Sequence, residues 1–139
     1  MKDAAPKLVL LLAGAYCFAS FTHFFHNAEF CGEYPNLPTW ISRTSVYWTW
    51  LALTALGATG VFIMQKIYRA TGLALLTIYG ALGFAGLGHY GLAPISRHTA
   101  VMNLTIGFEV VAAAALLTVT LRALAKSYDA DQNPKHKKV

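Results

Sequence analysis

The chain has 139 residues, of which 56% are hydrophobic and 12% are charged, and its formal net charge is +5. Soluble domains of this length rarely combine so many apolar residues with so few charges, so the composition indicates a membrane protein. We assign the positive charge to topology and to anionic lipid headgroups, because a short lysine tail without interleaved aromatic residues does not favour nucleic-acid binding.

Four apolar stretches are long enough to cross a bilayer, whose hydrocarbon core of roughly 30 Å takes about 20 helical residues. They run at about 7–28, 45–65, 71–92 and 98–124. Each stretch is longer than a barrel strand and lacks strict alternation, and helices satisfy their own backbone hydrogen bonds in lipid. The sequence therefore predicts an all-α integral membrane protein, with residues 1–139 forming one bundle of four transmembrane helices.

Nine of the eleven Lys and Arg residues flank one set of helix ends. They lie before the first stretch, between the second and the third, and at or beyond the end of the fourth, in a basic tail that we expect at 125–139. Because positively charged loops stay in the cytoplasm, we expect both termini to be cytoplasmic and a bacterial inner membrane to be the location. The connections at 28–44 and 93–97 then face outward.

The end of the first predicted helix carries polar side chains where a membrane helix is usually apolar. In FTHFFHNAEF, residues 21–30, the side chains of His23, His26 and Asn27 share one helical face with Tyr16. Phe18, Phe21 and Phe25 fall on roughly the opposite face, which we expect to contact lipid. We therefore expect the histidines to point into the bundle.

The 28–44 connection contains two prolines together with Glu29, Glu33, Tyr34 and Trp40. This composition fits an ordered cap over the outer end of the bundle. It fits equally well an interfacial loop with aromatic anchors, and the sequence leaves both alternatives open.

The third predicted helix contains glycine at every third position, Gly80, Gly83 and Gly86, before His89. Small residues in one row allow a neighbouring helix to approach closely, so we interpret this row as a packing seam. The position of His89 after the seam places it at about the depth of His26.

The fourth predicted helix contains Glu109, about 17 Å along the helix from its outer end at 1.5 Å per residue. An ionisable group at this depth costs at least about 2.5 kcal/mol and usually faces a cavity or a partner. His98, Met102 and Thr105 share its face, and Asn103 lies on an adjacent one. We therefore expect a polar shaft between the first, third and fourth helices, open outward, with Tyr16 and Glu109 at its floor.

A transition-metal site is the first functional hypothesis. His23 and His26 are spaced to chelate one ion, His89 can add a nitrogen, and Glu29 or Glu109 can complete a shell that suits zinc, copper or iron. Haem b is a variant of this hypothesis, with a histidine of the first helix and His89 as axial ligands and Met102 as another candidate. In either form the site could act on a lipophilic substrate.

The second hypothesis needs no metal. A carboxyl group in an apolar pocket favours its neutral form, so Glu109 can act as a general acid or base, with a histidine as partner and with Tyr16 and Asn103 as hydrogen-bonding groups. Such a site could isomerise or hydrate a lipid-like or sterol-like molecule, or only bind it.

Three segments, THFFHNAEF, YPNLPTW and VMNLTIGFE, give a layout that loosely resembles the four-helix superfamily of sterol isomerases and sigma-2 receptors. The resemblance implies an intramembrane site built from histidine and glutamate. The His-to-Glu spacing in THFFHNAEF departs from the pattern of that superfamily.

The third hypothesis is structural. Lone polar residues within membranes often join one helix to another, each contributing about 0.6 kcal/mol on average. The chain would then be a homo-oligomer or an assembly subunit of a larger membrane complex.

Overall fold

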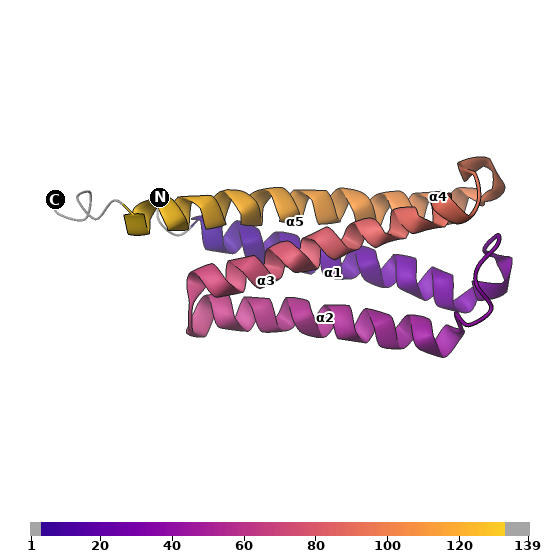
Figure 1. Cartoon of the computed structure of the whole chain (residues 1–139), viewed down its shortest axis with the longest axis horizontal. Helices are drawn as coiled ribbons and strands as arrows, with labels where there is room; N and C mark the ends of the chain where they lie inside the picture. Colours follow the sequence, from indigo (N-terminus) through magenta and orange to yellow (C-terminus); the bar gives the residue numbers. More distant parts are fainter. Residues whose placement is uncertain (1–3, 133–139) are drawn as a thin grey trace.

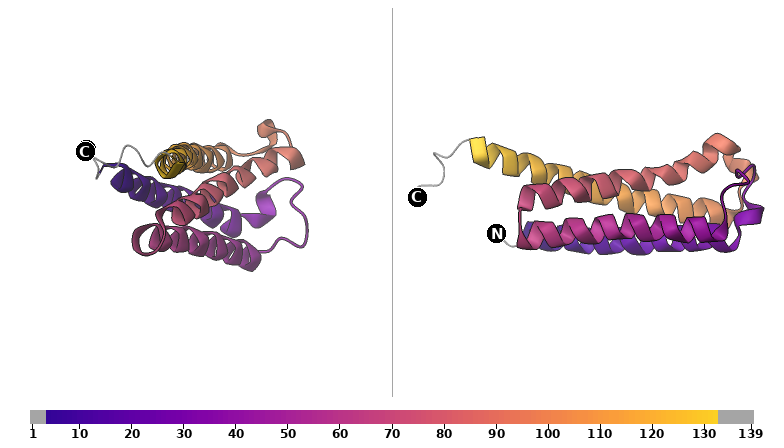
Figure 2. Two further views of the ribbon diagram at one scale, coloured as in Figure 1. Left: turned by 60° about the vertical axis from the view of Figure 1, so that its left-hand side comes forward. Right: turned by 60° about the horizontal axis from the view of Figure 1, so that its bottom comes forward.

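The computed structural model describes residues 4–132, in which all regular secondary structure is helical. Four helical rods lie side by side along the long axis (Figure 1, Figure 2). The first, second and fourth rods are α1 Ala4–Glu29, α2 Arg43–Lys66 and α5 Ala100–Gln132. The third rod consists of α3 Arg69–Leu82, the 3₁₀ segment η2 Gly83–Gly88 and α4 His89–Leu92. Two short 3₁₀ turns, η1 Cys31–Glu33 and η3 Ile95–Arg97, lie in the connections.

The two ends of the bundle differ. One end, which we name the loop end, carries the connections at 30–42 and 93–99. The other, the terminal end, holds the start of α1, the turn between α2 and α3, and the end of α5 (Figure 1).

Four spans of the structure are long and apolar enough to cross a membrane, which confirms the predicted set of four helices. They are Pro6–Glu29, Arg43–Lys66, Arg69–Leu92 and Ala100–Tyr128, with mean hydropathy between 1.5 and 2.0. The predicted third helix is not a continuous α-helix, because η2 interrupts it. α5 continues to Gln132, beyond the predicted end of the fourth helix, and residues 133–139 of the predicted tail lie outside the described part of the chain.

The ends of α2 have local causes in the sequence. Ser42 caps its start, because the Ser42 hydroxyl accepts a hydrogen bond from the Ser45 amide while the Ser45 hydroxyl accepts one from the Ser42 amide. After Lys66 the chain reverses within two residues into α3. Gly72 then lies directly against the Met64 backbone, where a Cβ atom would clash. These features fix α2 and α3 as a tightly packed antiparallel pair.

The apolar core lies toward the terminal end and joins three of the rods. Its buried members are Val9, Ala13, Tyr16, Leu73, Leu76, Tyr79, Ala113 and Leu116, from α1, α3 and α5. α2 packs mainly against α3 and also against α1. Because α2 lies at the side of this three-rod core, space remains between it and the other rods near the loop end, where the candidate site is found.

Candidate functional site

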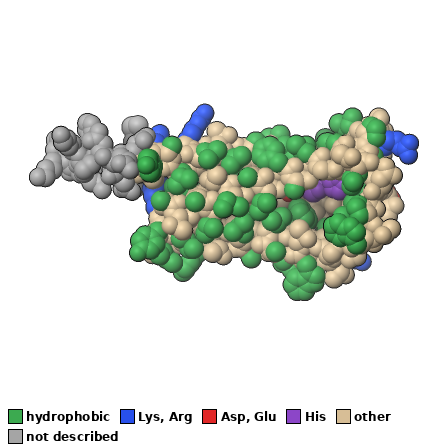
Figure 3. All heavy atoms as spheres, in the orientation of Figure 1, with side chains coloured by type: hydrophobic (Ala, Val, Ile, Leu, Met, Phe, Trp, Pro, Cys, Tyr) green, Lys and Arg blue, Asp and Glu red, His purple; other side chains and the backbone are tan. Residues whose placement is uncertain are grey.

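A cavity of about 410 Å³ lies near the loop end, bounded by α1, α2, the third rod, the 30–42 connection and, at Glu109, α5. We name it the loop-end cavity. Most of its wall is apolar, with Phe24 from α1, Leu37 and Ile41 from the connection, and Val46 from α2. Two other lining residues, Trp40 and Leu82, are exposed on the outside of the bundle, so the cavity opens sideways. Histidine side chains border a hollow on the face that Figure 3 shows.

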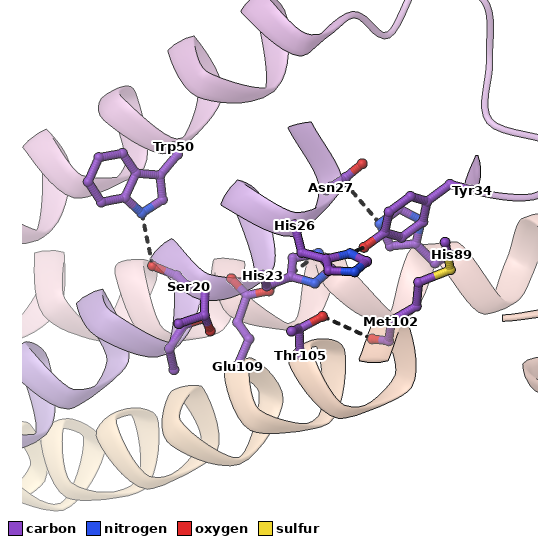
Figure 4. Close-up of polar contacts among 12 residues, drawn as sticks. Ser20, His23, His26, Asn27, Tyr34, Trp50, His89, Met102, Thr105 and Glu109 are labelled. Atoms are coloured by element: carbon purple, nitrogen blue, oxygen red, sulfur yellow. Dashed lines mark hydrogen bonds and ion pairs between the residues drawn. The ribbon is translucent and has the colours of Figure 1, made fainter. Parts of the chain in front are cut away.

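A pair of ionisable side chains lies at the back of the loop-end cavity. His23 of α1 and Glu109 of α5 both line it, and Nε2 of His23 is 3.8 Å from Oε2 of Glu109 (Figure 4). The two residues are only 2% and 1% exposed. At 3.8 Å the two atoms are too far apart for a direct hydrogen bond. The two side chains are therefore close enough to act on one bound group, and neither forms a direct hydrogen bond with the other through these atoms.

Three buried polar atoms at the back of this cavity find no hydrogen-bond partner among residues 4–132. They are Nδ1 of His23, Oδ1 of Asn27 and Oε2 of Glu109. Buried polar atoms in proteins are paired in the large majority of cases, with protein groups or with ordered water. Three such atoms around one cavity thus offer hydrogen-bonding positions to a guest molecule.

Gly86 of η2 leaves the His23–Glu109 pair accessible from the cavity. A Cβ atom at Gly86 would lie 3.1 Å from Oε2 of Glu109 and 3.8 Å from Nε2 of His23. Any larger residue would therefore fill the space directly in front of the pair. The glycine that the sequence presented as part of a packing seam forms a wall of the cavity.

His89 of α4 is held from two sides. The Asn27 side chain donates from Nδ2 to Nε2 of His89 at 3.2 Å, and the His89 ring lies 4.8 Å from the ring of Tyr34 (Figure 4). The ring of His89 is also 5.4 Å from that of His23. His89 is thus positioned beside the pair, with one ring nitrogen occupied by Asn27.

His26 does not line the loop-end cavity, although it was predicted to act with His23. Nδ1 of His26 is 3.0 Å from the hydroxyl of Tyr34, which lies in the 30–42 connection. Burial raises the pKa of Tyr34 to about 12, so its hydroxyl keeps its proton at neutral pH. The contact ties the end of α1 to the connection above the cavity.

Glu29 also lies apart from the pair. Its Oε1 accepts a hydrogen bond from the Tyr47 hydroxyl at 2.6 Å and pairs with the Arg43 guanidinium at 2.8 Å. Both partners belong to α2. Glu29 therefore joins α1 to α2 at the loop end, a contact that the sequence did not reveal.

The predicted metal ligands do not gather into one centre. Within the described part of the chain, no group of three or more His, Cys, Asp or Glu side chains is arranged to hold a metal ion. The metal site predicted from His23, His26, His89 and Glu29 is not supported by this arrangement. Binding of zinc, copper, iron or haem b stays a prediction.

The predicted catalytic residues also separate. Of Glu109, Tyr16 and Asn103, only Glu109 lines the cavity. Tyr16 is fully buried and packs with its ring 4.5 Å from that of Tyr79. Asn103 accepts a hydrogen bond from the Tyr90 hydroxyl at 3.0 Å and donates to the Ile95 carbonyl at 3.2 Å, which holds the 93–99 connection.

The expected shaft between the first, third and fourth helices needs correction, because α2 forms one wall of the cavity. Sequence reasoning missed this wall and its two hydroxyl groups, Ser45 and Thr49. Their spacing of four residues, which places both on one face of α2, was the available signal. Asn27 was expected to face inward but was not chosen as a site residue.

No protein-family model matches the chain, and neither a curated protein nor a solved structure matches it with significance.

Proposed function

We propose that the chain is an integral membrane protein that binds a lipophilic small molecule in the loop-end cavity and performs acid–base chemistry on it with His23 and Glu109. The observation that carries this proposal is the meeting of an apolar cavity with three buried polar atoms for which residues 4–132 provide no partner. Small-molecule sites are typically concave and mostly apolar, with a few convergent polar groups. The cavity volume of about 410 Å³ falls within the range of roughly 300–1,000 Å³ that such sites occupy.

The polar atoms define the chemistry of the guest. The amide oxygen of Asn27 accepts a hydrogen bond. The carboxyl group of Glu109 and Nδ1 of His23 each accept or donate one, according to whether they carry a proton. The apolar walls of the cavity favour a guest whose larger part is hydrocarbon. We therefore expect a lipophilic molecule with one hydroxyl or carbonyl group at its inner end.

The spacing of the pair suits a proton shift within the bound molecule. One member removes a proton from a carbon atom of the substrate, and the other returns a proton at a second carbon atom, so that a double bond moves and no co-reactant is consumed. The 3.8 Å between Nε2 of His23 and Oε2 of Glu109 places both groups at one small region of the substrate. Isomerisation is the reaction class that we favour.

The location that we propose follows from the distribution of apolar and basic residues. Four spans are long and apolar enough to cross a membrane. Lys and Arg residues flank the terminal end of the bundle, which supports cytoplasmic termini and an outward-facing loop end. A sideways opening of the cavity would then admit a substrate from the bilayer.

A pair of glycine substitutions tests the proposal. Gly86→Ala places a methyl group 3.1 Å from Oε2 of Glu109, whereas Gly91→Ala, the control, meets nothing within 4 Å. We expect organic extracts of the purified wild-type protein and of Gly91→Ala to contain one enriched lipophilic species by mass spectrometry, and Gly86→Ala to lack it. Identical extracts from all three proteins would contradict the proposal.

A transition metal is the second candidate, and the observation that favours it is the distance of 5.4 Å between the rings of His23 and His89. Elemental analysis and the visible spectrum separate the candidates. The acid–base proposal predicts neither stoichiometric zinc, copper or iron nor a haem band. One equivalent of metal that is lost in both His23→Ala and His89→Ala would favour the metal centre.

A further inference from the structure

A second cavity, of about 450 Å³, lies between α1 and α2 toward the terminal end. It shares no lining residue with the loop-end cavity. Along α1, Ser20 lies between Cys17, which lines the second cavity, and His23, which lines the loop-end cavity. The Ser20 hydroxyl accepts a hydrogen bond from the Trp50 indole of α2 at 3.3 Å (Figure 4). The second cavity is therefore a separate site.

The wall of the second cavity is mostly apolar, with Leu10 and Ala13 from α1 and Val61 and Phe62 from α2. Among the described residues that line it there is no Asp, Glu, His, Lys or Arg. Phe62 is 58% exposed, and the lining residue Gly14 is exposed as well, so the cavity opens to the side of the bundle. Such a cavity suits an uncharged, lipophilic guest.

The Tyr79 side chain of α3 is the most deeply buried polar group of this wall. Tyr79 is 2% exposed, and its hydroxyl has no hydrogen-bond partner within residues 4–132. Its ring lies 4.5 Å from the ring of Tyr16 on α1. A Cβ atom on Gly57 of α2 would be 2.6 Å from Cε1 of Tyr79 and 2.9 Å from Cζ, which carries the hydroxyl. The ring is thus held between two helices, with its hydroxyl end against α2.

Thr54 places a second hydroxyl group on the same face of α2. It is three residues before Gly57, so the two residues are neighbours, with about 5–6 Å between Cβ positions. Three other helix threonines donate their hydroxyls to the carbonyl four residues earlier: Thr49, Thr77 and Thr118. The buried Thr54 hydroxyl makes no such bond and no other within residues 4–132. It therefore stays available, beside Tyr79, on the wall of the second cavity.

We propose that the second cavity binds an uncharged lipophilic molecule through a carbonyl oxygen that accepts hydrogen bonds from the Tyr79 and Thr54 hydroxyls. Each hydroxyl has one proton to donate, and a carbonyl oxygen has two lone pairs and no proton. One carbonyl oxygen therefore satisfies both buried donors. An alcohol brings a third proton to the same oxygens, and a hydrocarbon leaves both donors unpaired, which is costly for buried groups.

The depth of the two hydroxyls narrows the class of guest. Thr54 lies midway along the span Arg43–Lys66, about 17 Å from either end at 1.5 Å per residue. With the spans in a bilayer, on which this step rests, that position is near the centre of a hydrocarbon core of roughly 30 Å. The ester carbonyls of phospholipids lie at the edges of this core. The guest is therefore a molecule that enters the core whole, such as a lipophilic ketone.

Three probes with the same carbon chain test the proposal: 2-tridecanone, 2-tridecanol and tridecane. A ligand that binds the folded protein alone raises its unfolding temperature. We expect 2-tridecanone to raise that of the full chain in detergent more than 2-tridecanol does, and tridecane to raise it least. The carbonyl stretch of the bound ketone should lie at lower frequency than in hydrocarbon solvent, because the oxygen accepts hydrogen bonds.

Two variants that remove only a hydroxyl group locate the site. Tyr79→Phe and Thr54→Val should each weaken ketone binding about tenfold, the loss of roughly one buried hydrogen bond. Thr118→Val is the control, because the Thr118 hydroxyl bonds its own helix on an exposed face, and it should bind as wild type. Should Tyr79→Phe fail to fold by circular dichroism, Thr54→Val carries the test.

A second pair of variants fills the cavity. Nothing lies within 4 Å of a Cβ atom added at Gly14, which lines the second cavity, or at Gly107 of α5, which lines neither. Gly14→Leu should abolish ketone binding and Gly107→Leu should keep it.

The loop-end cavity is tested separately with Gly86→Ala, which should still bind the ketone, so the second site and the proposed function can fail independently. An equal response of the wild-type chain to ketone and tridecane would overturn the second site. So would undiminished ketone binding in folded Tyr79→Phe and Thr54→Val, or binding that is lost in Gly86→Ala and kept in Gly14→Leu.

Discussion

At the scale of single residues, the molecule is defined by the facing side chains of His23 and Glu109. Burying two ionisable groups in an apolar bundle is costly unless they are compensated by each other or by a ligand. Their separation of 3.8 Å and exposure of 1–2% fit a pair that is stabilised partly by each other and completed by a guest. A guest that binds both side chains would therefore offset the cost of burying them.

Replacement of Glu109 by Gln tests the acid–base role, since the amide keeps the size of the carboxyl group but does not exchange protons readily. Proton removal from carbon would introduce deuterium into the bound lipophilic molecule when the protein is incubated in heavy water. We expect Glu109→Gln to slow this incorporation by about 10²–10⁴-fold. Mass spectrometry of the extracted molecule measures it, and equal incorporation in the variant would exclude Glu109 as acid or base.

The direction of the Glu29 side chain could not be predicted from its own helix. Helical phasing correctly turned His23 and Asn27 inward and Phe21 and Phe25 outward, because those directions depend on one helix alone. The direction of Glu29 depends on Arg43, which another helix brings within 2.8 Å. Such a pairing requires the relative register of two helices, which a single sequence does not specify.

Glu29→Gln should weaken the fold only slightly. Because Arg43 is mostly exposed, the ion pair is worth about 0.2–1 kcal/mol, the range of surface pairs. Glu33→Gln, at an exposed position in the 30–42 connection, is the control. Thermal unfolding in detergent measures the difference. Loss of a bound metal from Glu29→Gln but not from Glu33→Gln would return Glu29 to the site.

At the scale of the elements, glycines decide how closely the rods pack. Apolar runs and polar breaks predicted four helices, but they did not predict the change to 3₁₀ geometry over Gly83–Gly88. Glycine carries no side chain that would mark the turn type, and Gly83 and Gly86 lie against Tyr16 and Glu109 of other helices. The spacing of three residues between glycines is the one sequence feature that matches the observed turn.

Gly72→Ala should destabilise the α2–α3 pair. The new methyl group would meet the Met64 backbone, which cannot rotate away, so a loss of about 1–3 kcal/mol is expected. Gly14→Ala is the matched control, since nothing lies within 4 Å of its added atom, and its helix should gain up to about 1 kcal/mol. Equal thermal stability of the two variants would contradict the close α2–α3 packing.

At the scale of the whole molecule, the two ends of the bundle differ: the terminal half is packed, and the loop end holds the cavity. Apolar side chains cover much of the face in Figure 3, and Lys and Arg side chains lie toward its two ends. The buried core fills the terminal half, and the loop-end cavity opens where α2 departs from the other rods. The fold class was predictable because a bilayer requires long apolar helices; the cavity was not, because it depends on how four helices tilt and pack.

The orientation of the chain can be measured with reporter fusions in bacteria. We expect a periplasmic enzyme such as alkaline phosphatase to be active when it is inserted at Asn36, in the exposed 30–42 connection. The same reporter should be inactive after Val139, where a fluorescent protein should instead be bright. The opposite pattern would reverse the proposed topology and place the loop-end cavity on the cytoplasmic side.

An experimental density map of the protein in lipid nanodiscs would show whether the His23–Glu109 pair binds a lipophilic guest. We expect an elongated feature in the loop-end cavity, with its polar end between Asn27 and Glu109, that disappears in Gly86→Ala. A compact spherical peak between His23 and His89, or a flat macrocycle beside them, would contradict it.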